Sequence, residues 1–130
     1  MITVGIPTYN EEKVIAKTIE SVLGQIAAED EVIVVASGCT DNTVPEIEAI
    51  VARDKRVRLI TEAERNGKSS ALNLIIQNAS ADIIVQTDGD VIVEPDAVGR
   101  LIRHFNDPKI GGVSGHPVPV IPRNNLFYEW

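Results

Sequence analysis

Short apolar runs and helix-like stripes alternate from one end of the chain to the other. The apolar runs, rich in β-branched residues, predict strands at residues 2–6, 31–36, 57–60 and 83–85, with residues 110–114 as a candidate fifth strand. Between them, apolar residues recur at helical spacing, as Ile15, Ile19, Val22 and Ile26 do. This alternation is typical of βαβ units. It predicts an α/β fold with three layers, α/β/α, in which helices cover both faces of a mostly parallel sheet.

Residues near the first strand predict where the first elements end. Pro7 follows the first apolar run, and because proline lacks a backbone N–H it predicts the end of that strand. Asn10 is a favourable cap for the first helix. Glu11 and Glu12 would then lie in its first turn, where the helix dipole favours acidic side chains.

The composition limits the partners of the chain. With 130 residues, 44% of them apolar, a single domain with a real core is expected. The net charge of -7 argues against a nucleic-acid partner, which requires a basic face. Cys39 is the only cysteine, which excludes a disulfide framework and a cysteine zinc site. Strand character begins at Ile2 and no apolar run approaches about 18 residues, so we expect a cytoplasmic chain without a membrane segment.

Two carboxylates follow the fourth predicted strand, which is expected to be buried, in the run Thr87-Asp88-Gly89-Asp90. In an open α/β sheet, ligands bind just outside the carboxyl ends of the strands. Two oxygen ligands at that edge suit a hard divalent cation, and such a cation usually carries substrate phosphates. The alternative is a polar turn, since Asp-Gly is a common turn dipeptide.

Three further loops are predicted to reach the same edge, at residues 7–11, 37–41 and 65–68. The ring of Tyr9 can stack on a base, and the carboxylate of Glu11 can accept hydrogen bonds from ribose hydroxyls. The third loop ends in Gly67-Lys68 at a predicted helix start, where backbone N–H groups bind phosphate. Taken singly, these residues also fit an ordinary loop aromatic and a solvated turn with a surface lysine.

Two other phosphate-related interpretations fit less well. A P-loop requires a second glycine five residues before Gly67, and Glu62 occupies that position. Haloacid-dehalogenase phosphatases carry an Asp-x-Asp pair after the first strand of the domain, whereas Asp88 and Asp90 follow the fourth.

Taken together, the motifs resemble the amino-terminal half of a family 2 glycosyltransferase with the GT-A fold. The matching segments occur in the family's order and cover nearly the whole chain. They are residues 6–12 (IPTYNEE), 35–43 (VASGCTDNT), 66–73 (NGKSSALN), 87–90 (TDGD) and 111–115 (GGVSG).

The resemblance implies an inverting transfer of a sugar from a nucleotide-diphospho-sugar donor to an acceptor. It implies that the base and ribose are held by Pro7, Thr8, Tyr9 and Glu11, and that Lys68 lies near the nucleotide. It also implies that Asp88 and Asp90 bind Mn²⁺ or Mg²⁺ and, through the ion, the diphosphate. The metal would act as a Lewis acid on the leaving group, and a separate carboxylate would act as general base on the acceptor.

The chain departs from the family pattern in two places. The second loop usually reads Asp-Asp-Gly-Ser, but Ala36 and Ser37 stand at the two acidic positions, so a hydroxyl would meet the base instead of a carboxylate. Only 15 residues follow Gly115, and none matches the Glu-Asp pair that supplies the general base, so the catalytic base is unknown.

These departures define the expected organisation. Residues 1–115 would form the nucleotide-sugar-binding half, and residues 116–130 the incomplete start of the acceptor side. The alternative is a nucleotide- and metal-binding module without transferase activity, either truncated or half of an assembly. The terminal aromatics Phe127, Tyr128 and Trp130 predict self-association, because a domain seldom ends on an exposed aromatic cluster.

Overall fold

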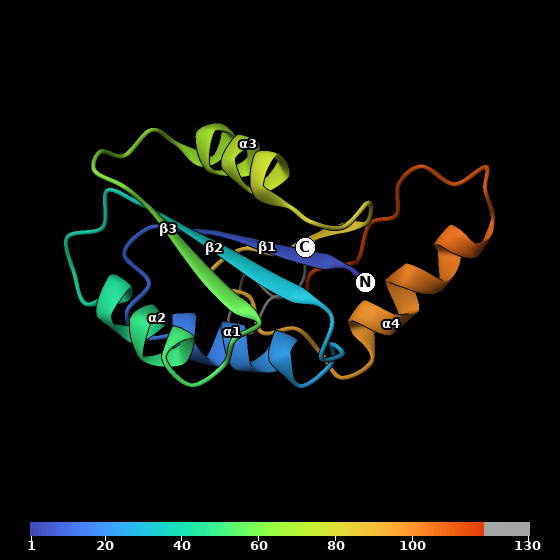
Figure 1. Cartoon of the computed structure of the whole chain (residues 1–130), viewed down its shortest axis with the longest axis horizontal. Helices are drawn as coiled ribbons and strands as arrows, with labels where there is room; N and C mark the ends of the chain where they lie inside the picture. The colour runs from blue at the N-terminus through green and yellow to red at the C-terminus, as the bar shows by residue number, and fades with distance from the viewer. Residues whose placement is uncertain (119–130) are drawn as a thin grey trace, which may run out of the picture.

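The computed structural model describes residues 1–118 and contains a four-stranded parallel sheet with strand order β3-β2-β1-β4. Figure 1 shows β3, β2 and β1 side by side in this order. In chain order the elements are β1 (Thr3–Thr8), α1 (Ile15–Leu23), β2 (Glu31–Ser37), α2 (Thr43–Val51), β3 (Val57–Glu62), α3 (Lys68–Asn78), β4 (Ile84–Gln86), α4 (Ala97–Ile102) and a 3₁₀ turn (Arg103–Asn106). The predicted order of the first four strands and of the helices between them is therefore confirmed.

Each face of the sheet carries its own apolar core. Alternate residues of β2 point to opposite faces, as the period of a strand requires. Val32, Val34 and Ala36 pack in the core with α1 and α2, whereas Ile33 and Val35 pack with α3. Figure 1 shows α3 on one face of the sheet and α1 and α2 on the other. The predicted α/β/α layering is confirmed.

The prediction that Pro7 ends the first strand is wrong, because β1 continues through Pro7 to Thr8. The backbone N–H of Thr3 donates to the Ile83 carbonyl, and the Gly5 carbonyl accepts from the Thr87 N–H, so the backbone groups of Thr3 and Gly5 point toward β4. Because this direction alternates along a strand, the backbone nitrogen of Pro7 points toward the β4 side too. The last register pair between β1 and β4 joins Gly5 to Gln86. Pro7 therefore lies beyond the end of β4, where its missing N–H removes no ladder bond.

The prediction that Asn10 caps the first helix is also wrong. The helix begins at Ile15, and Asn10 lies in the loop before it with a φ of 51°. Its side-chain amide instead bonds to Thr40: the Asn10 amide donates to the Thr40 hydroxyl at 3.1 Å, and the Thr40 N–H donates to Asn10 Oδ1 at 2.8 Å. A long-range pair thus replaces the local cap, and asparagine tolerates this left-handed conformation better than most residues.

The edge of the sheet differs from the prediction as well. Among residues 1–118, β4 pairs only with β1, and Ile84 is 37% exposed, so β4 is the edge strand of the described sheet and not the buried strand that was predicted. Residues 110–114, the candidate fifth strand, have no regular secondary structure. Gly111 and Gly112 contribute no side chains to pack there, and glycine loses the most backbone entropy on ordering.

The proposed division at residue 115 and the self-association through the terminal aromatics concern a region that is mostly or wholly outside the described residues, which end at 118. Within residues 1–118, none of the helices combines the length and the apolar character needed to cross a membrane.

Candidate functional site

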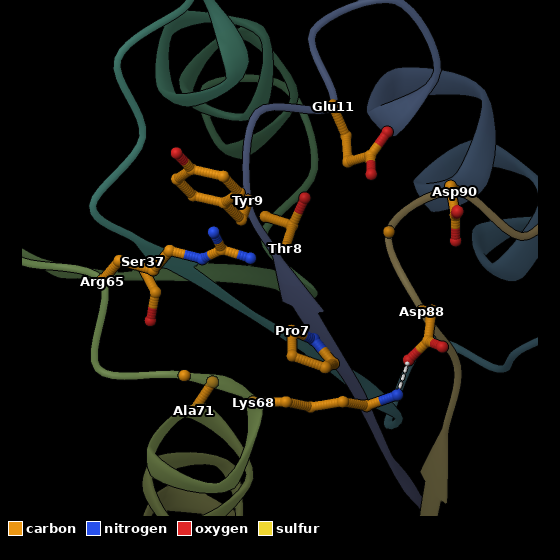
Figure 2. Close-up of a pocket in the computed structure, with 12 residues that line it drawn as sticks. Pro7, Thr8, Tyr9, Glu11, Ser37, Arg65, Lys68, Ala71, Asp88 and Asp90 are labelled. Carbon is orange, nitrogen blue, oxygen red and sulfur yellow. Dashed lines mark ion pairs between the residues drawn. The ribbon is translucent and has the colours of Figure 1, made fainter.

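A cavity of about 300 Å³ opens at the carboxyl edge of the sheet, where the four predicted loops meet (Figure 2). Every residue predicted for the site lines this cavity: Pro7, Thr8, Tyr9, Glu11, Ser37, Lys68, Asp88 and Asp90. The cavity is also lined by four residues that were not assigned to the site from sequence: Arg65, Gly67, Ala71 and Gly89. The loops gather here because all four strands are parallel and end at the same edge.

Hydrogen bonds connect the loop after β1 to the loop after β2. They are made by the side chains of Thr43, the first residue of α2, and of Asp41 just before it. The backbone N–H of Glu11 donates to the Thr43 hydroxyl at 2.8 Å, and that hydroxyl donates to Asp41 Oδ1 at 2.6 Å. Asp41 Oδ2 accepts from the backbone N–H of Glu12 at 3.3 Å. These bonds, with the Asn10–Thr40 pair, hold the loop that carries Tyr9 and Glu11 against the second loop.

The turn that carries Asp88 and Asp90 is anchored through the glycine between them. The Thr18 hydroxyl of α1 donates to the Gly89 carbonyl at 3.0 Å in a buried position. A Cβ added to Gly89 would lie 2.5 Å from Thr8 Oγ1, so a side chain does not fit here without movement of β1. Glycine at this position therefore allows the acidic turn to approach the end of β1 closely.

Lys68 reaches across the cavity to the first of the two acids. Its Nζ lies 2.6 Å from Asp88 Oδ1, and the two side chains are 54% and 44% exposed (Figure 2). Apart from this ion pair, the buried Oδ1 of Asp88 has no hydrogen-bond partner, and the buried hydroxyl oxygen of Thr8 has none either. Buried polar atoms without partners call for a missing ligand, ion or water, and both of these residues line the cavity.

Glu11 lies close enough to the acidic turn to respond to its charge. Burial raises the pKa of Glu11 above its ordinary value, and the carboxylates of Asp90 and Asp41 raise the pKa further. A cation at this end of the cavity would relieve that repulsion. Residues 1–118 nevertheless contain no group of three or more His, Cys, Asp or Glu side chains able to hold an ion, so a ligand would have to complete the coordination.

The other end of the cavity is aromatic and positively charged. Tyr9 is 36% exposed, and the guanidinium carbon of Arg65 lies 4.0 Å from the centre of its ring (Figure 2). This distance is a cation–π contact. The sequence predicted that Arg65 lies in a turn at this edge, but its contact with Tyr9 depends on how two loops 56 positions apart fold together.

Glu62, at the end of β3, was noticed in the sequence only because it breaks the P-loop pattern. In the structure its carboxylate accepts hydrogen bonds from the hydroxyl of Ser37, from the Asn66 amide at 3.0 Å and from the Ser70 hydroxyl at 2.7 Å. These donors, Ser37 first, hold the pKa of Glu62 below its ordinary value. No local pattern could have identified these partners, which come from β2, the third loop and α3.

Comparison with known proteins places this geometry in a family. The family model described as glycosyl transferase family 2 matches residues 3–129. Poly-beta-1,6-N-acetyl-D-glucosamine synthase from Staphylococcus aureus is 36% identical over 117 residues, which are 89% of this chain and 28% of that protein. The synthase of the same name from Staphylococcus epidermidis is 33% identical over 110 residues, 84% of this chain and 26% of that protein. The chain thus spans little more than a quarter of these relatives.

Solved structures show the same fold. A mannosyltransferase from Pyrobaculum calidifontis, in complex with GDP-Man and Mn²⁺, matches 85% of this chain and 33% of its own length, with a TM-score of 0.78 and 33% identity. Residues 1–349 of TarS from S. aureus, in complex with UDP-GlcNAc, match 91% of this chain and 36% of their own length, with a TM-score of 0.74 and 23% identity. The parallel sheet with flanking helices is therefore that of the GT-A glycosyltransferases.

Proposed function

The chain belongs to glycosyl transferase family 2, and on this premise we propose that its cavity binds a nucleoside diphosphate sugar with a divalent cation. The observation that carries the proposal is the arrangement of the cavity: Tyr9 and Arg65 lie at one end, and Lys68, Asp88 and Asp90 at the other (Figure 2). A nucleoside diphosphate has the same two parts, a planar base and a charged diphosphate. The mannosyltransferase that is 33% identical to this chain was solved with such a donor and Mn²⁺.

At the base end, the proposed contacts are apolar and aromatic. Pro7 and Tyr9 would flank the base, and Ser37 would meet its polar edge. Stacking of a base on an aromatic ring contributes about 1–3 kcal/mol. The Glu11 carboxylate would accept a hydrogen bond from a ribose hydroxyl, and the Thr8 hydroxyl, which has no hydrogen-bond partner in the free chain, would bond to another.

At the diphosphate end, the residues present fit a hard cation. Asp88 and Asp90 would hold Mn²⁺ or Mg²⁺, and Oδ1 of Asp88, which pairs with the Lys68 ammonium in the free chain, would be released to the ion as Lys68 turns to the phosphates. Phosphate oxygens would complete the coordination, since the described part of the chain contains no group of three or more His, Cys, Asp or Glu side chains that could hold the ion alone. Bound there, the ion would supply Lewis-acid stabilisation of the leaving diphosphate. Lys68 would add a positive charge at the phosphates.

We propose further that the whole protein is an inverting glycosyltransferase, of which this chain supplies the donor side. A displacement needs an acceptor oxygen placed at the anomeric carbon and a base within reach of its proton. No residue after Gly115 matches the family's base. We therefore expect the 130-residue chain to bind donor but to transfer sugar poorly, at most hydrolysing the donor slowly.

The second candidate function is a nucleotide- and metal-binding module without transfer activity. The observation in its favour is coverage, because the chain spans 28% of its relative from S. aureus. Sugar transfer to any acceptor by the purified chain, at rates near the enzyme median of about 10 s⁻¹, would exclude the module. Nucleotide binding without any turnover would favour it.

Calorimetric titration with UDP and with GDP, each with and without Mn²⁺, tests the binding proposal. One of them should bind with Mn²⁺, and at 100 times the dissociation constant it should stabilise the fold by about 2.7 kcal/mol. Asp90→Ala should abolish the Mn²⁺ dependence while leaving the melting temperature of the free chain nearly unchanged. Asp82→Ala, which removes an exposed acid at the other end of β4, is the matched control. Absence of binding by either nucleotide under all conditions would refute the proposal.

A further inference from the structure

Ser37 and Glu62 end two neighbouring strands at the same level of the sheet. They are register partners in the parallel pairing of β2 with β3. Both lie on the face covered by α3, because Ile33 and Val35 of β2 and Ile60 of β3 pack in the α3 core at alternate positions. The Ser37 hydroxyl donates a hydrogen bond to Glu62 Oε2. Ser37 is buried, 4% exposed, and it lines the cavity.

The direction of this hydrogen bond is set by the rest of the Glu62 environment. Glu62 Oε1 accepts from the Asn66 amide and the Ser70 hydroxyl, so the carboxylate is surrounded by three donors. These donors lower the pKa of Glu62, so it is ionised at neutral pH and can only accept. The single proton of the Ser37 hydroxyl is therefore committed to Glu62. Only the lone pairs of Ser37 remain for a ligand.

We infer that Glu62 is a positioning residue for base selection, which makes Ser37 an acceptor toward the bound nucleotide. This inference rests on the proposed function, with the base at the Tyr9 end of the cavity. An acceptor at this point matches a base whose pairing edge carries a ring N–H, namely uracil at N3 or guanine at N1. Cytosine at N3 and adenine at N1 carry a lone pair instead, which would face the lone pairs of Ser37. Their exocyclic amino groups could donate to Ser37 only if the base shifted from the position in which its ring nitrogen meets Ser37, so these bases would either lose that position or leave buried acceptors unpaired. The site thus selects uridine or guanosine diphosphates over cytidine or adenosine diphosphates.

The substitution Glu62→Gln should reverse the selection. The oxygen of the new amide is expected at the Oε1 position, because the Asn66 amide and the Ser70 hydroxyl both donate there. The amide nitrogen then takes the Oε2 position and donates to Ser37. The proton of the Ser37 hydroxyl is released and can be donated to a ring nitrogen with a lone pair. A change of one atom outside the cavity lining should therefore alter base preference.

The experiment measures the affinities of UDP, CDP, GDP and ADP, each with saturating Mn²⁺, for four proteins by calorimetry. The unsubstituted chain should bind UDP over CDP, or GDP over ADP, by about tenfold or more, the usual effect of one unpaired buried group. Ser37→Ala should reduce that ratio to about threefold or less, and Glu62→Gln should shift it toward CDP or ADP. Ser70→Ala is the matched control, because it removes another donor to Glu62 but leaves the Ser37 bond, and it should keep the ratio.

The outcomes separate the inference from the proposed function. If none of the nucleotides binds the unsubstituted chain, the proposed function fails and the inference fails with it. If UDP or GDP binds but the ratio is the same in the unsubstituted chain, Ser37→Ala and Glu62→Gln, only the inference is overturned. Thermal unfolding of each variant checks the fold, since a merely structural Glu62 would lower the melting temperature and weaken all four nucleotides equally. If Glu62→Gln does not fold, the ratio in Ser37→Ala decides.

Discussion

Replacing Lys68 by Met should change metal binding and nucleotide binding in opposite directions. In the structure the Lys68 ammonium lies 2.6 Å from Asp88 Oδ1, the atom that we propose as a metal ligand. Without nucleotide, Lys68 and a divalent cation compete for the same carboxylate. With nucleotide, the same ammonium is expected to lie near the diphosphate and to favour its binding.

The size of the effect follows from the exposure of the pair. The side chains of Lys68 and Asp88 are 54% and 44% exposed, so water screens their interaction as at a surface. Pairs of this kind contribute about 0.2–1 kcal/mol. We expect the Lys68–Asp88 interaction to lie in the upper half of that range. Its loss in Lys68→Met should therefore strengthen Mn²⁺ binding to the free chain by about two- to fivefold. Binding of UDP or GDP without metal should weaken by a similar factor.

Electron paramagnetic resonance of free Mn²⁺ measures the first effect, and calorimetry without metal measures the second. Lys17→Met is the matched control, because Lys17 is exposed on α1 and its loss changes the net charge equally. It should leave both affinities unchanged. If folded Lys68→Met bound Mn²⁺ as weakly as the unsubstituted chain, or more weakly, Lys68 would not compete for Asp88 and the reasoning would be refuted.

Three further predictions concern the base, the acidic turn and the fold. Tyr9→Ala should weaken nucleotide binding by about 1–3 kcal/mol with or without Mn²⁺, whereas Tyr9→Phe should keep most of the affinity. If Tyr9→Ala bound nucleotide as tightly as the unsubstituted chain, stacking of the base on this ring would be excluded. Gly89→Ala should destabilise the chain by about 1–3 kcal/mol in urea unfolding, because the added Cβ would clash with Thr8. Gly99→Ala in α4 is the control and should not destabilise the chain, because no atom lies within 4 Å of the added Cβ. Hydrogen bonds from Arg56 lower the pKa of Asp54 to about 2, so its stabilising contribution is present above the ordinary value of 3.8 and is lost as the pH falls toward 2. Asp54→Asn should flatten this part of the acid unfolding curve, and an unchanged curve would contradict the pairing.

The fold and the meeting point of the site could be predicted because both depend on repeated, local features. Apolar runs separated by amphipathic stripes specify parallel βαβ units, and parallel strands necessarily end at one edge. The loops that carry Tyr9, Ser37, Lys68 and Asp88 were therefore expected together, and they line one cavity. The errors fell on single residues whose partners are distant. Asn10 bonds to Thr40 and not to its own helix, and Pro7 is tolerated in β1 only because β4 ends before it.

The amino-acid sequence by itself determined the layers, the strand polarity and the edge at which the acidic and aromatic residues gather. Only the tertiary structure decided which of these side chains touch. The Lys68–Asp88 ion pair, the contact of Arg65 with the Tyr9 ring and the Ser37–Glu62 hydrogen bond each join residues on different elements. Such pairs depend on strand register and on the close approach of loops, which are set by packing over the whole sheet. Periodicity along the chain reports which face a residue occupies, but it carries no information about the residue that packing places opposite.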